Sequence, residues 1–416
     1  MLPPPNSPPK PMPNGIGKDL LQNLRLAVLD SANVSRGGRR TASVHEFYRY
    51  PARFSPAFAR AAIATFTKPR DLVIDPFSGG GTSVVEAQLL GRHSIAADIN
   101  PLATFVTTAK TTLYSEETLD ELRGLSETVR GLPIRAGLPL HNRWAEQGYW
   151  RNISSHQTWR IRNLLLNGID AVKGLATHEA QMLGRCALLR TGQWALDIRQ
   201  AIPTGSQFRN QLSQDIKGMI EAASNHHNLV MEEWGEPTQP VVITSGLPAS
   251  AKDPLMNSSG FPHLIITSPP YPGVYVLYHR WKVQGRRETP APFWIANCLD
   301  GHGINHYTMS ARNQDSSRLY FEKLRIAFSS IVNLMSTDTW MIQMVGFNNG
   351  VRQTNQYLHL MKDIGLEEIR FPTLANCSDG RLWRSVPGRR WWVVAGKRAG
   401  TAPNTSKEVV LFYRRR

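Results

Sequence analysis

Short apolar runs alternate with amphipathic stretches in two separate parts of the chain. In the first part, residues 71–75 (DLVID) form an apolar run before a Gly-rich turn, and residues 82–90 have helical periodicity that stops at Gly91. A second apolar run at 94–98 follows, and Pro101 suits the first turn of another helix. A strand–helix–strand–helix order at this spacing predicts a parallel sheet.

The same alternation returns in the last third of the chain. It predicts two helices, at 318–335 and 355–364. Apolar runs predict the later strands at 241–244, 263–267, 339–347, 366–371, 391–395 and 409–413. Together with the first two runs, this pattern predicts an α/β fold of the Rossmann-like type with a sheet of about seven strands.

Between these two parts, residues 111–240 have a different character. Segments such as WRIRNLLLNGIDAV and EAQMLGRCALLRTGQWAL have helical periodicity with Arg on their polar faces. We interpret this region as a mainly helical insertion that divides an α/β core into residues 17–110 and 241–416. The Pro-rich residues 1–16 predict a disordered tail, and residues 272–317 predict an irregular insertion.

The excess of basic over acidic residues favours an anionic binding partner. Forty-eight Lys and Arg against 32 Asp and Glu give a formal net charge of +16 and a pI near 10.0. A chain this basic commonly binds a polyanion, because neutralising phosphates releases counterions. The composition therefore favours a nucleic acid without distinguishing DNA from RNA, and a solvated basic surface without such a partner is the alternative.

Cysteine usage and hydropathy bear on location. Cys186, Cys298 and Cys377 are far apart and form no CxxC pair, which favours a reducing compartment and disfavours a disulfide framework or a thiolate zinc site. No apolar run reaches the length of a membrane span, and the Pro-rich first residues contain no stretch of signal-peptide type. We therefore expect a cytoplasmic protein with no membrane segment, and its oligomeric state stays open.

The first motif that could form part of a binding site is VIDPFSGGGTSVVEAQLLGRHSIAADINPLA, residues 73–103. The glycines at 79–81 let the backbone approach a ligand closely, and the start of the next helix offers N–H donors to an anionic group. Asp98 ends the second strand, where it can accept hydrogen bonds from a ribose. A tight glycine turn with Asp98 as a helix cap is the alternative, which the strand and helix context disfavours.

The second motif is ITSPPYPG, residues 266–273. Two prolines stiffen the loop and remove backbone donors, so it presents carbonyls and the Ser268 hydroxyl as acceptors beside Tyr271. An exocyclic amine of a base is a poor nucleophile, because its lone pair is delocalised into the ring. Acceptors for its N–H bonds would place that lone pair in line with a methyl donor, so that catalysis comes from orientation and electrostatics. A proline-rich turn without function is the alternative.

The two motifs together resemble those of the DNA amino-methyltransferases, which modify cytosine N4 or adenine N6. DPFSGGGT is similar to that family's cofactor motif DPFxGxGT, and TSPPY is similar to its catalytic (D/N/S)PP(Y/F) motif. A third stretch at 45–63, HEFYRYPARFSPAFARAAI, is similar to the segment near the methionine end of the cofactor. The resemblance covers residues 45–110 and 240–275 well. It implies a seven-stranded methyltransferase sheet and S-adenosyl-L-methionine as cofactor.

The resemblance also implies roles for particular residues. Those it assigns to the cofactor site are Tyr50, Ala52, Phe54, Asp75, Pro76, Phe77, Gly79, Gly81, Thr82, Asp98 and Asn100. Those it assigns to the target base and catalysis are Ser268, Pro269, Pro270 and Tyr271. Two features depart from the family pattern: residues 244–247 (TSGL) lack the acid that often follows the third strand, and the large insertion precedes that strand.

Several weaker signals remain. His302 and His306 have a metal-like spacing, but no carboxylate or thiolate cluster accompanies them, so we expect a polar loop and no metal. Basic and aromatic residues are interleaved at 278–289 and 381–394, which makes both segments candidates for DNA contact. The insertion at 111–240 is a candidate recognition region. It carries the arginines Arg185, Arg190, Arg199 and Arg209.

The leading hypothesis is methyl transfer to an exocyclic amine in double-stranded DNA at a specific site, with the target base flipped out. Cytosine N4 is favoured, because a Ser at the head of the PPY motif is the commoner choice for that target in the resembling family. Adenine N6, an RNA base, and a non-catalytic nucleic-acid-binding relic stay open as alternatives. Methylation of cytosine C5 is disfavoured because it requires a cysteine nucleophile.

Overall fold

A computed structural model of the chain describes most of its residues. The described ranges are 16–30, 43–50, 55–134, 142–244, 260–271, 280–285, 287–300, 309, 316–347, 350–387 and 405–416. Residues 1–15 of the tail predicted at 1–16, and the strand predicted at 391–395, lie outside them. Within them, no helix combines the length and the apolar character that a membrane crossing requires.

A twisted sheet forms the core of the molecule. Its strands are β1 (Leu72–Asp75), β2 (His93–Asp98), β3 (Val241–Thr244), β4 (Leu264–Thr267), β7 (Trp340–Gly346), β8 (Leu366–Ile369), β9 (Leu382–Pro387) and β10 (Thr405–Arg415). The order is β3-β2-β1-β4-β7-β10-β8, with β9 also paired to β10. The pairs from β3 to β7 are parallel, and β10 runs antiparallel to its neighbours. This arrangement confirms the Rossmann-like α/β prediction, with β9 as an eighth strand.

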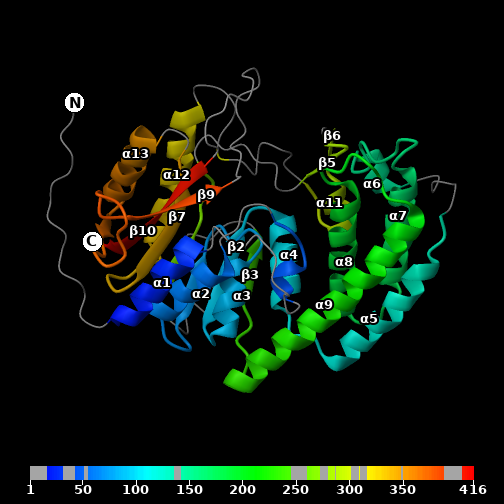
Figure 1. Ribbon diagram of the computed structural model, residues 1–416, viewed down its shortest axis with the longest axis horizontal. Coiled ribbons are helices and arrows are strands. Elements are labelled where there is room, and N and C mark those ends of the chain that lie inside the picture. The colour runs from blue at the N-terminus through cyan, green and yellow to red at the C-terminus, as the bar shows by residue number, and fades with distance from the viewer. Residues whose placement is uncertain are drawn as a thin grey trace.

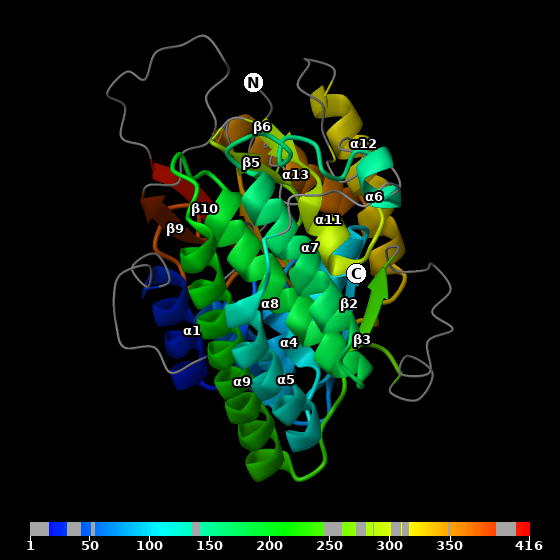
Figure 2. The same cartoon turned by 90° about the vertical axis from the view of Figure 1, so that its right-hand side faces the viewer.

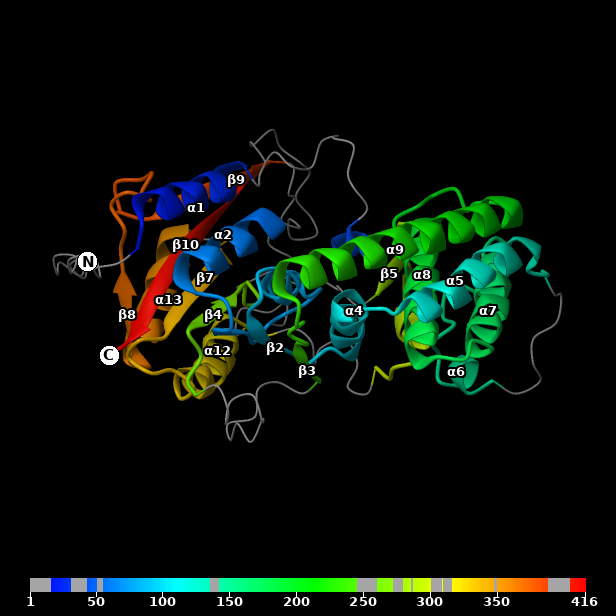
Figure 3. The same cartoon turned by 90° about the horizontal axis from the view of Figure 1, so that it is seen from below.

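Successive side chains of the strands pack on opposite faces of the sheet, and helices cover both faces. Leu72 and Ile74 face one hydrophobic cluster with α12 (Ser316–Val332) and α13 (Gly350–Asp363), while Val73 faces another with α1 and α2. The helices on that second face are α1 (Lys18–Asp30) and α2 (Pro56–Phe66). Figure 3 shows α1 and α2 on one side of the sheet and α12 on the other. Burial on both faces explains why these strands are continuous apolar runs.

The sheet order changes direction between β1 and β4, which creates the crevice that ligands use in open α/β sheets. Two helices follow the strands on one side of this point: α3 (Thr82–Leu89) and α4 (Pro101–Thr111). Pro101 occupies the first turn of α4, and the Asn100 side chain caps the helix, as its sequence position suggests. The crevice therefore lies beside both motifs.

The insertion between α4 and β3 is helical, as predicted. It contains α5 (Glu116–Thr128), α6 (Arg143–Glu146), α7 (Trp159–Lys173), α8 (His178–Leu196) and α9 (Gly205–Trp234), with short 3-10 turns η1 (Val44–Glu46) before it and η2 (Val129–Gly131) within it. Figure 1 shows these helices as a second body beside the sheet, with the lower end of α9 returning to the core. There the Trp234 indole donates to the Leu89 carbonyl at 3.1 Å, which ties the two bodies together.

The segment at 272–317 is not wholly irregular, which corrects the prediction. Its described part forms the hairpin β5 (Trp281–Val283) and β6 (Arg287–Thr289), followed by α11 (Ala291–Ala296). Figure 2 shows this hairpin near the top of the view, above α11. Trp281 is buried, and its indole donates to the Tyr48 hydroxyl at 3.0 Å. The short strands escaped prediction because tertiary packing around Trp281, rather than alternation, defines them.

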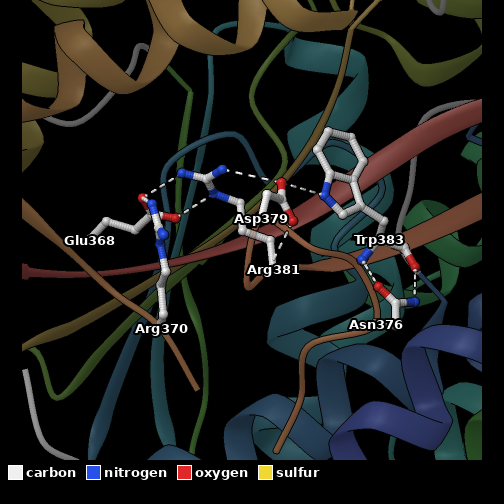
Figure 4. Close-up of polar contacts among 6 residues, drawn as sticks. All are labelled: Glu368, Arg370, Asn376, Asp379, Arg381 and Trp383. Atoms are coloured by element: carbon white, nitrogen blue, oxygen red, sulfur yellow. Dashed lines mark hydrogen bonds and ion pairs between the residues drawn. The ribbon is translucent and has the colours of Figure 1, made fainter. Parts of the chain in front are cut away.

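In the described part of the segment at 381–394, a candidate for DNA contact, Arg381 and Trp383 are bonded within the protein. Arg381 binds Glu368 of β8 through Nε and Nη2 at 2.6 and 2.8 Å, and the Trp383 indole donates to Asp379 at 2.9 Å. Figure 4 shows this network with Arg370 and Asn376 beside it. The network fixes the loop before β9, so Arg381 and Trp383 serve the fold there.

Candidate active site

The glycine turn after β1 is a narrow cradle at the carboxyl edge of the sheet. Gly81 has a left-handed φ of 74°, and a Cβ there would lie 2.7 Å from the Thr107 side chain. A Cβ on Gly80 would lie 2.7 Å from the Cβ of Tyr50. Both positions therefore require glycine. Because α3 begins directly after the turn, its first N–H groups lack intrahelical partners and favour a negatively polarised group.

Asp98, at the end of β2, is bonded to this turn. Its Oδ2 accepts a hydrogen bond from the Gly79 N–H at 2.9 Å, and its Oδ1 accepts one from the Asn100 N–H at 2.8 Å. The Asn100 Nδ2 in turn donates to the Tyr50 hydroxyl at 3.1 Å. The structure thus brings Tyr50, Gly79, Asp98 and Asn100 together from three separate segments.

The polar groups of the cradle fit a polar cofactor. The hydroxyls of Ser78 and Thr82 are buried and make no hydrogen bond among the described residues. Such groups cost free energy unless a bound molecule satisfies them. The buried Lys110 ammonium donates to the Gly80 carbonyl at 2.8 Å, which adds a cation beside the turn. Sequence reasoning missed Ser78 and Lys110, although a lysine within the apolar stretch LATFVTTAKTT was a usable signal.

Asp75 connects the two motifs from inside the protein. Its Oδ1 accepts hydrogen bonds from the Thr267 hydroxyl at 2.9 Å and the Phe77 N–H at 3.2 Å, and its Oδ2 accepts one from the Ser83 hydroxyl. The side chain is only 1% exposed. Because Thr267 directly precedes Ser268, these bonds fix the glycine turn against the start of the second motif. Pro76 is buried next to Asp75, and Phe77 packs on Phe328.

Burial changes the ionisation of both acids. It raises the pKa of Asp75 to about 6, against the opposing hydrogen bonds from Ser83, Thr267 and Phe77. It also raises the pKa of Asp98 to about 6, against those from Asn100 and Gly79. A carboxylate that costs free energy to bury gains from additional donors, which is what ribose hydroxyls supply.

The second motif forms a fixed loop at the end of β4. The Ser268 Oγ lies 3.0 Å from the Met344 carbonyl oxygen and 3.1 Å from the Tyr271 hydroxyl. Pro269 is buried, and the Pro270 carbonyl accepts a hydrogen bond from the Tyr320 hydroxyl at 2.8 Å. The loop is therefore held by β7 and α12. Tyr320 was not predicted, because its helix is far away in the sequence.

Not every predicted residue can be placed. Ala52, Phe54, His302 and His306 lie outside the described residues. Thr244, where the family pattern often has an acid nearby, bonds through its hydroxyl to that of Thr104 at 2.8 Å. The described site therefore consists of the glycine cradle with Asp98 and the loop with Ser268.

Three of the four arginines that the sequence singled out in the insertion are bound within the protein. Arg185 donates to the Ile295 carbonyl at 2.8 Å, Arg190 pairs with Asp215 at 3.0 Å, and Arg209 donates to the Leu132 carbonyl at 2.9 Å. These three guanidiniums stabilise the helical packing. Arg199 differs: it is exposed, and its guanidinium lies over the Trp194 ring at 4.5 Å.

Comparison with known proteins agrees with this geometry. A family model described as DNA methylase, N6_N4_Mtase, matches residues 27–107, the segment that contains the glycine cradle and Asp98. Type II methyltransferase M.BsoBI of Geobacillus stearothermophilus is 25% identical over 271 residues, which cover 57% of this chain and 51% of that protein. The chain therefore resembles the DNA amino-methyltransferases, most clearly in the segment that carries the glycine cradle and Asp98.

Two further relatives match this chain over shorter stretches. Type II methyltransferase M.MjaII of Methanocaldococcus jannaschii is 30% identical over 20% of this chain and 16% of its own length. Type II methyltransferase M.MvaI of Kocuria varians is 37% identical over 22% of this chain and 21% of its own length. The chain spans about half the length of the first relative and less of the other two.

Proposed function

We propose that the chain transfers a methyl group from S-adenosyl-L-methionine to the exocyclic amine of a base in DNA, with cytosine N4 as the target. The observation that carries this proposal is the junction at Asp75. Its hydrogen bonds join the glycine turn of β1 to Thr267, so a cofactor cradle and an SPPY loop meet at one edge of the sheet. The intact pair of motifs disfavours a non-catalytic relic.

The residues that would hold the cofactor surround the glycine turn. Asp98 accepts from the ribose hydroxyls, Gly79, Gly81 and Thr82 line the cradle, and Tyr50 with Asn100 closes one side of it. The bound cofactor supplies an electrophilic methyl group on a sulfonium. Asp75, Pro76 and Phe77 support the turn from within, because the Asp75 carboxylate is engaged by protein donors.

The SPPY loop would orient the amine. Ser268 and the carbonyls of the loop accept the two N–H bonds of the target nitrogen, which favours a pyramidal nitrogen with its lone pair directed at the methyl group. The Tyr271 ring contacts the flipped base, and Pro269 and Pro270 keep the loop rigid. The target choice of cytosine N4 rests on the Ser at the head of the motif.

The α8–α9 corner is the part of the helical insertion best suited to read DNA. A hollow of about 380 Å³ there is lined by Trp194, Arg199 and the amides of Gln207, Asn210 and Gln214, among others. Amide side chains match adenine edges, and Arg matches guanine. The Gln193 amide donates to the Arg49 carbonyl at 3.1 Å, so the corner adjoins the segment that carries Tyr50.

The decisive experiment is mass spectrometry of nucleosides from DNA and RNA incubated with the protein and isotopically labelled cofactor. We expect labelled N4-methylcytosine from DNA. Labelled N6-methyladenine would correct the target base, and a labelled ribonucleoside alone would correct the polymer. A protein that binds cofactor and DNA but labels no nucleoside would refute methyl transfer.

A further inference from the structure

A buried acid from the end of the chain contacts the SPPY loop. The Oε1 of Glu408, in β10, accepts a hydrogen bond from the Tyr271 hydroxyl at 3.0 Å. Glu408 is 1% exposed. Burying a carboxylate costs free energy unless it is paired and hydrogen-bonded. Glu408 therefore needs polar partners at its position in the apolar strand EVVLFY.

Three neighbouring strands form one row under the tyrosine. Glu408 pairs with Arg384 of β9 on one side and with Gly346 of β7 on the other. Arg384 is 8% exposed, and its Nε and Nη2 lie 2.7 and 2.5 Å from the Glu408 Oε2. The guanidinium thus engages Oε2, while Oε1 binds the Tyr271 hydroxyl.

Gly346, the third residue of this row, leaves the space that the Tyr271 ring occupies. A Cβ on Gly346 would lie 2.9 Å from the Tyr271 Cε2 and 3.3 Å from the Glu408 Cγ. Any larger residue would push the ring off the strand. Gly346 therefore lets the ring lie against β7 while the hydroxyl reaches Glu408.

The hydrogen bonds of this arrangement have a defined direction. A carboxylate only accepts, so the Tyr271 hydroxyl must donate to Glu408. The Tyr271 oxygen and the Met344 carbonyl then both act as acceptors for the single Ser268 proton, at 3.1 and 3.0 Å. With its proton directed into the protein, Ser268 keeps its lone pairs for a donor from outside.

We propose that Glu408, held by Arg384, is a positioning residue that fixes the Tyr271 ring and makes Ser268 a hydrogen-bond acceptor toward the target amine. The proposal rests on the proposed function. A Ser268 proton directed at the amine would instead occupy the lone pair that must attack the methyl group. The added strand β9 has a role here, because it supplies the Arg384 guanidinium that pairs with the Glu408 carboxylate inside the sheet.

The test compares single-turnover methyl transfer, cofactor affinity and thermal stability in matched variants. Glu408→Gln keeps the size of the side chain but can turn an N–H toward Tyr271, and Tyr271→Phe removes the hydroxyl while keeping the ring. We expect each to slow methyl transfer by about 10- to 100-fold, the order of loss that a small misplacement of reacting groups causes. Cofactor affinity should stay within about twofold, because neither residue contacts the cradle residues in the bonds described.

The double variant separates positioning from general damage. Because both changes remove the same hydrogen bond, Glu408→Gln with Tyr271→Phe should be no slower than the slower single variant. If Glu408→Gln alone leaves the Arg384 charge too costly to bury, Glu408→Gln with Arg384→Met restores folding and should still be slow. Gly346→Ala is an independent variant that should displace the ring and slow transfer with Glu408 intact.

Glu368→Gln is the control, because it breaks a similar carboxylate–arginine pair in the same sheet (Figure 4). It should lower the melting temperature while methyl transfer keeps its wild-type rate. If Glu408→Gln transfers methyl groups at the wild-type rate, or loses only what Glu368→Gln loses, the positioning role is wrong although the methyltransferase stands. A wild-type protein that methylates no base refutes the proposed function, and this inference with it.

Discussion

In the sheet core, buried polar side chains converge on the carboxyl ends of β1, β2 and β4. In the helical insertion, they bind the helices to one another. Asp98 accepts a hydrogen bond from a glycine turn that has buried hydroxyls without a described hydrogen-bond partner nearby. Arg185 and Arg209, by contrast, donate to backbone carbonyls in or next to the insertion. Polar groups in the core are thus arranged for a ligand, and most of those in the insertion are satisfied within the protein.

The formal charge is also distributed unequally between the two regions. Residues 111–240 hold 13 Lys or Arg and 14 Asp or Glu, so the formal excess of +16 lies entirely outside the helical insertion. Phosphate contacts should therefore come mainly from the core and its flanking segments. The insertion has amides and Arg199 at the α8–α9 corner, which suit base edges better than a general attraction to DNA. The net charge of a whole chain says little about which region binds.

The largest effect should come from the catalytic loop. Ser268→Ala removes the acceptor that orients the amine, and we expect methyl transfer to slow by about 100- to 1,000-fold, as for loss of one preorganised hydrogen-bonding group in other enzymes. Calorimetry should find cofactor binding nearly intact, because Ser268 bonds to Met344 and Tyr271 and to none of the cradle residues. A parallel loss of cofactor affinity would show that the two halves of the site are not separable in this way.

Within the core, Asp98→Ala should mainly lower the affinity for the cofactor and affect the rate of methyl transfer less. Loss of a charged hydrogen bond should weaken affinity by roughly 1.5–3 kcal/mol. Asp120→Ala, in an exposed pair with Arg123 on α5, is the control and should leave cofactor affinity unchanged. Unchanged affinity in a folded Asp98→Ala protein, measured by calorimetry, would contradict the ribose role.

The sequence predicted the parts of the core that follow local rules. The apolar runs at 71–75 and 94–98 became β1 and β2 within one residue of their expected limits, because strands buried on both faces are continuous apolar runs. The glycine turn and the loop at Ser268 were likewise evident, since each is one contiguous stretch. Asp75 was recognised, but not that its carboxylate turns inward to Thr267 and Ser83.

What the sequence could not predict depends on pairing between distant segments. Glu408 and Arg384 meet only because β9 and β10 pair in one register, and no apolar run in the sequence predicted β9. A charged residue inside the strand EVVLFY was the available signal for Glu408. For Arg185, Arg190 and Arg209, the helical pattern placed arginine on polar faces but could not reveal internal partners.

A smaller effect should follow from the pKa of Asp98. Burial raises this pKa to about 6, and the charged form accepts from the ribose, so cofactor affinity should fall as pH drops below about 6, by up to about tenfold per pH unit. The contribution of Asp98 to apo-protein stability has the opposite sign. A raised folded-state pKa favours the folded state as pH falls from about 6 toward the unfolded value near 4.

Asp98→Asn tests both signs with one isosteric change. It should weaken cofactor binding at pH 7 and remove this pH dependence between 5 and 7, as measured by calorimetry at constant ionic strength. Thermal unfolding of the apo variant should also lose the stability gained by the wild type on acidification. A binding curve that keeps its wild-type pH dependence in Asp98→Asn would assign the titration to another group.

The smallest effect tests the exposed arginine that lines the α8–α9 corner. Arg199 is exposed and stacked on Trp194, so Arg199→Ala should leave thermal stability nearly unchanged. If Arg199 contacts a phosphate, the slope of log K against log salt should fall by about one. If it contacts a base edge, affinity for the target site should fall by about 1–3 kcal/mol with little change in slope. Arg123→Ala, an exposed arginine on α5, should change neither. Equal DNA affinity and salt slope in wild type and Arg199→Ala would remove the corner from the DNA interface and leave recognition to the core.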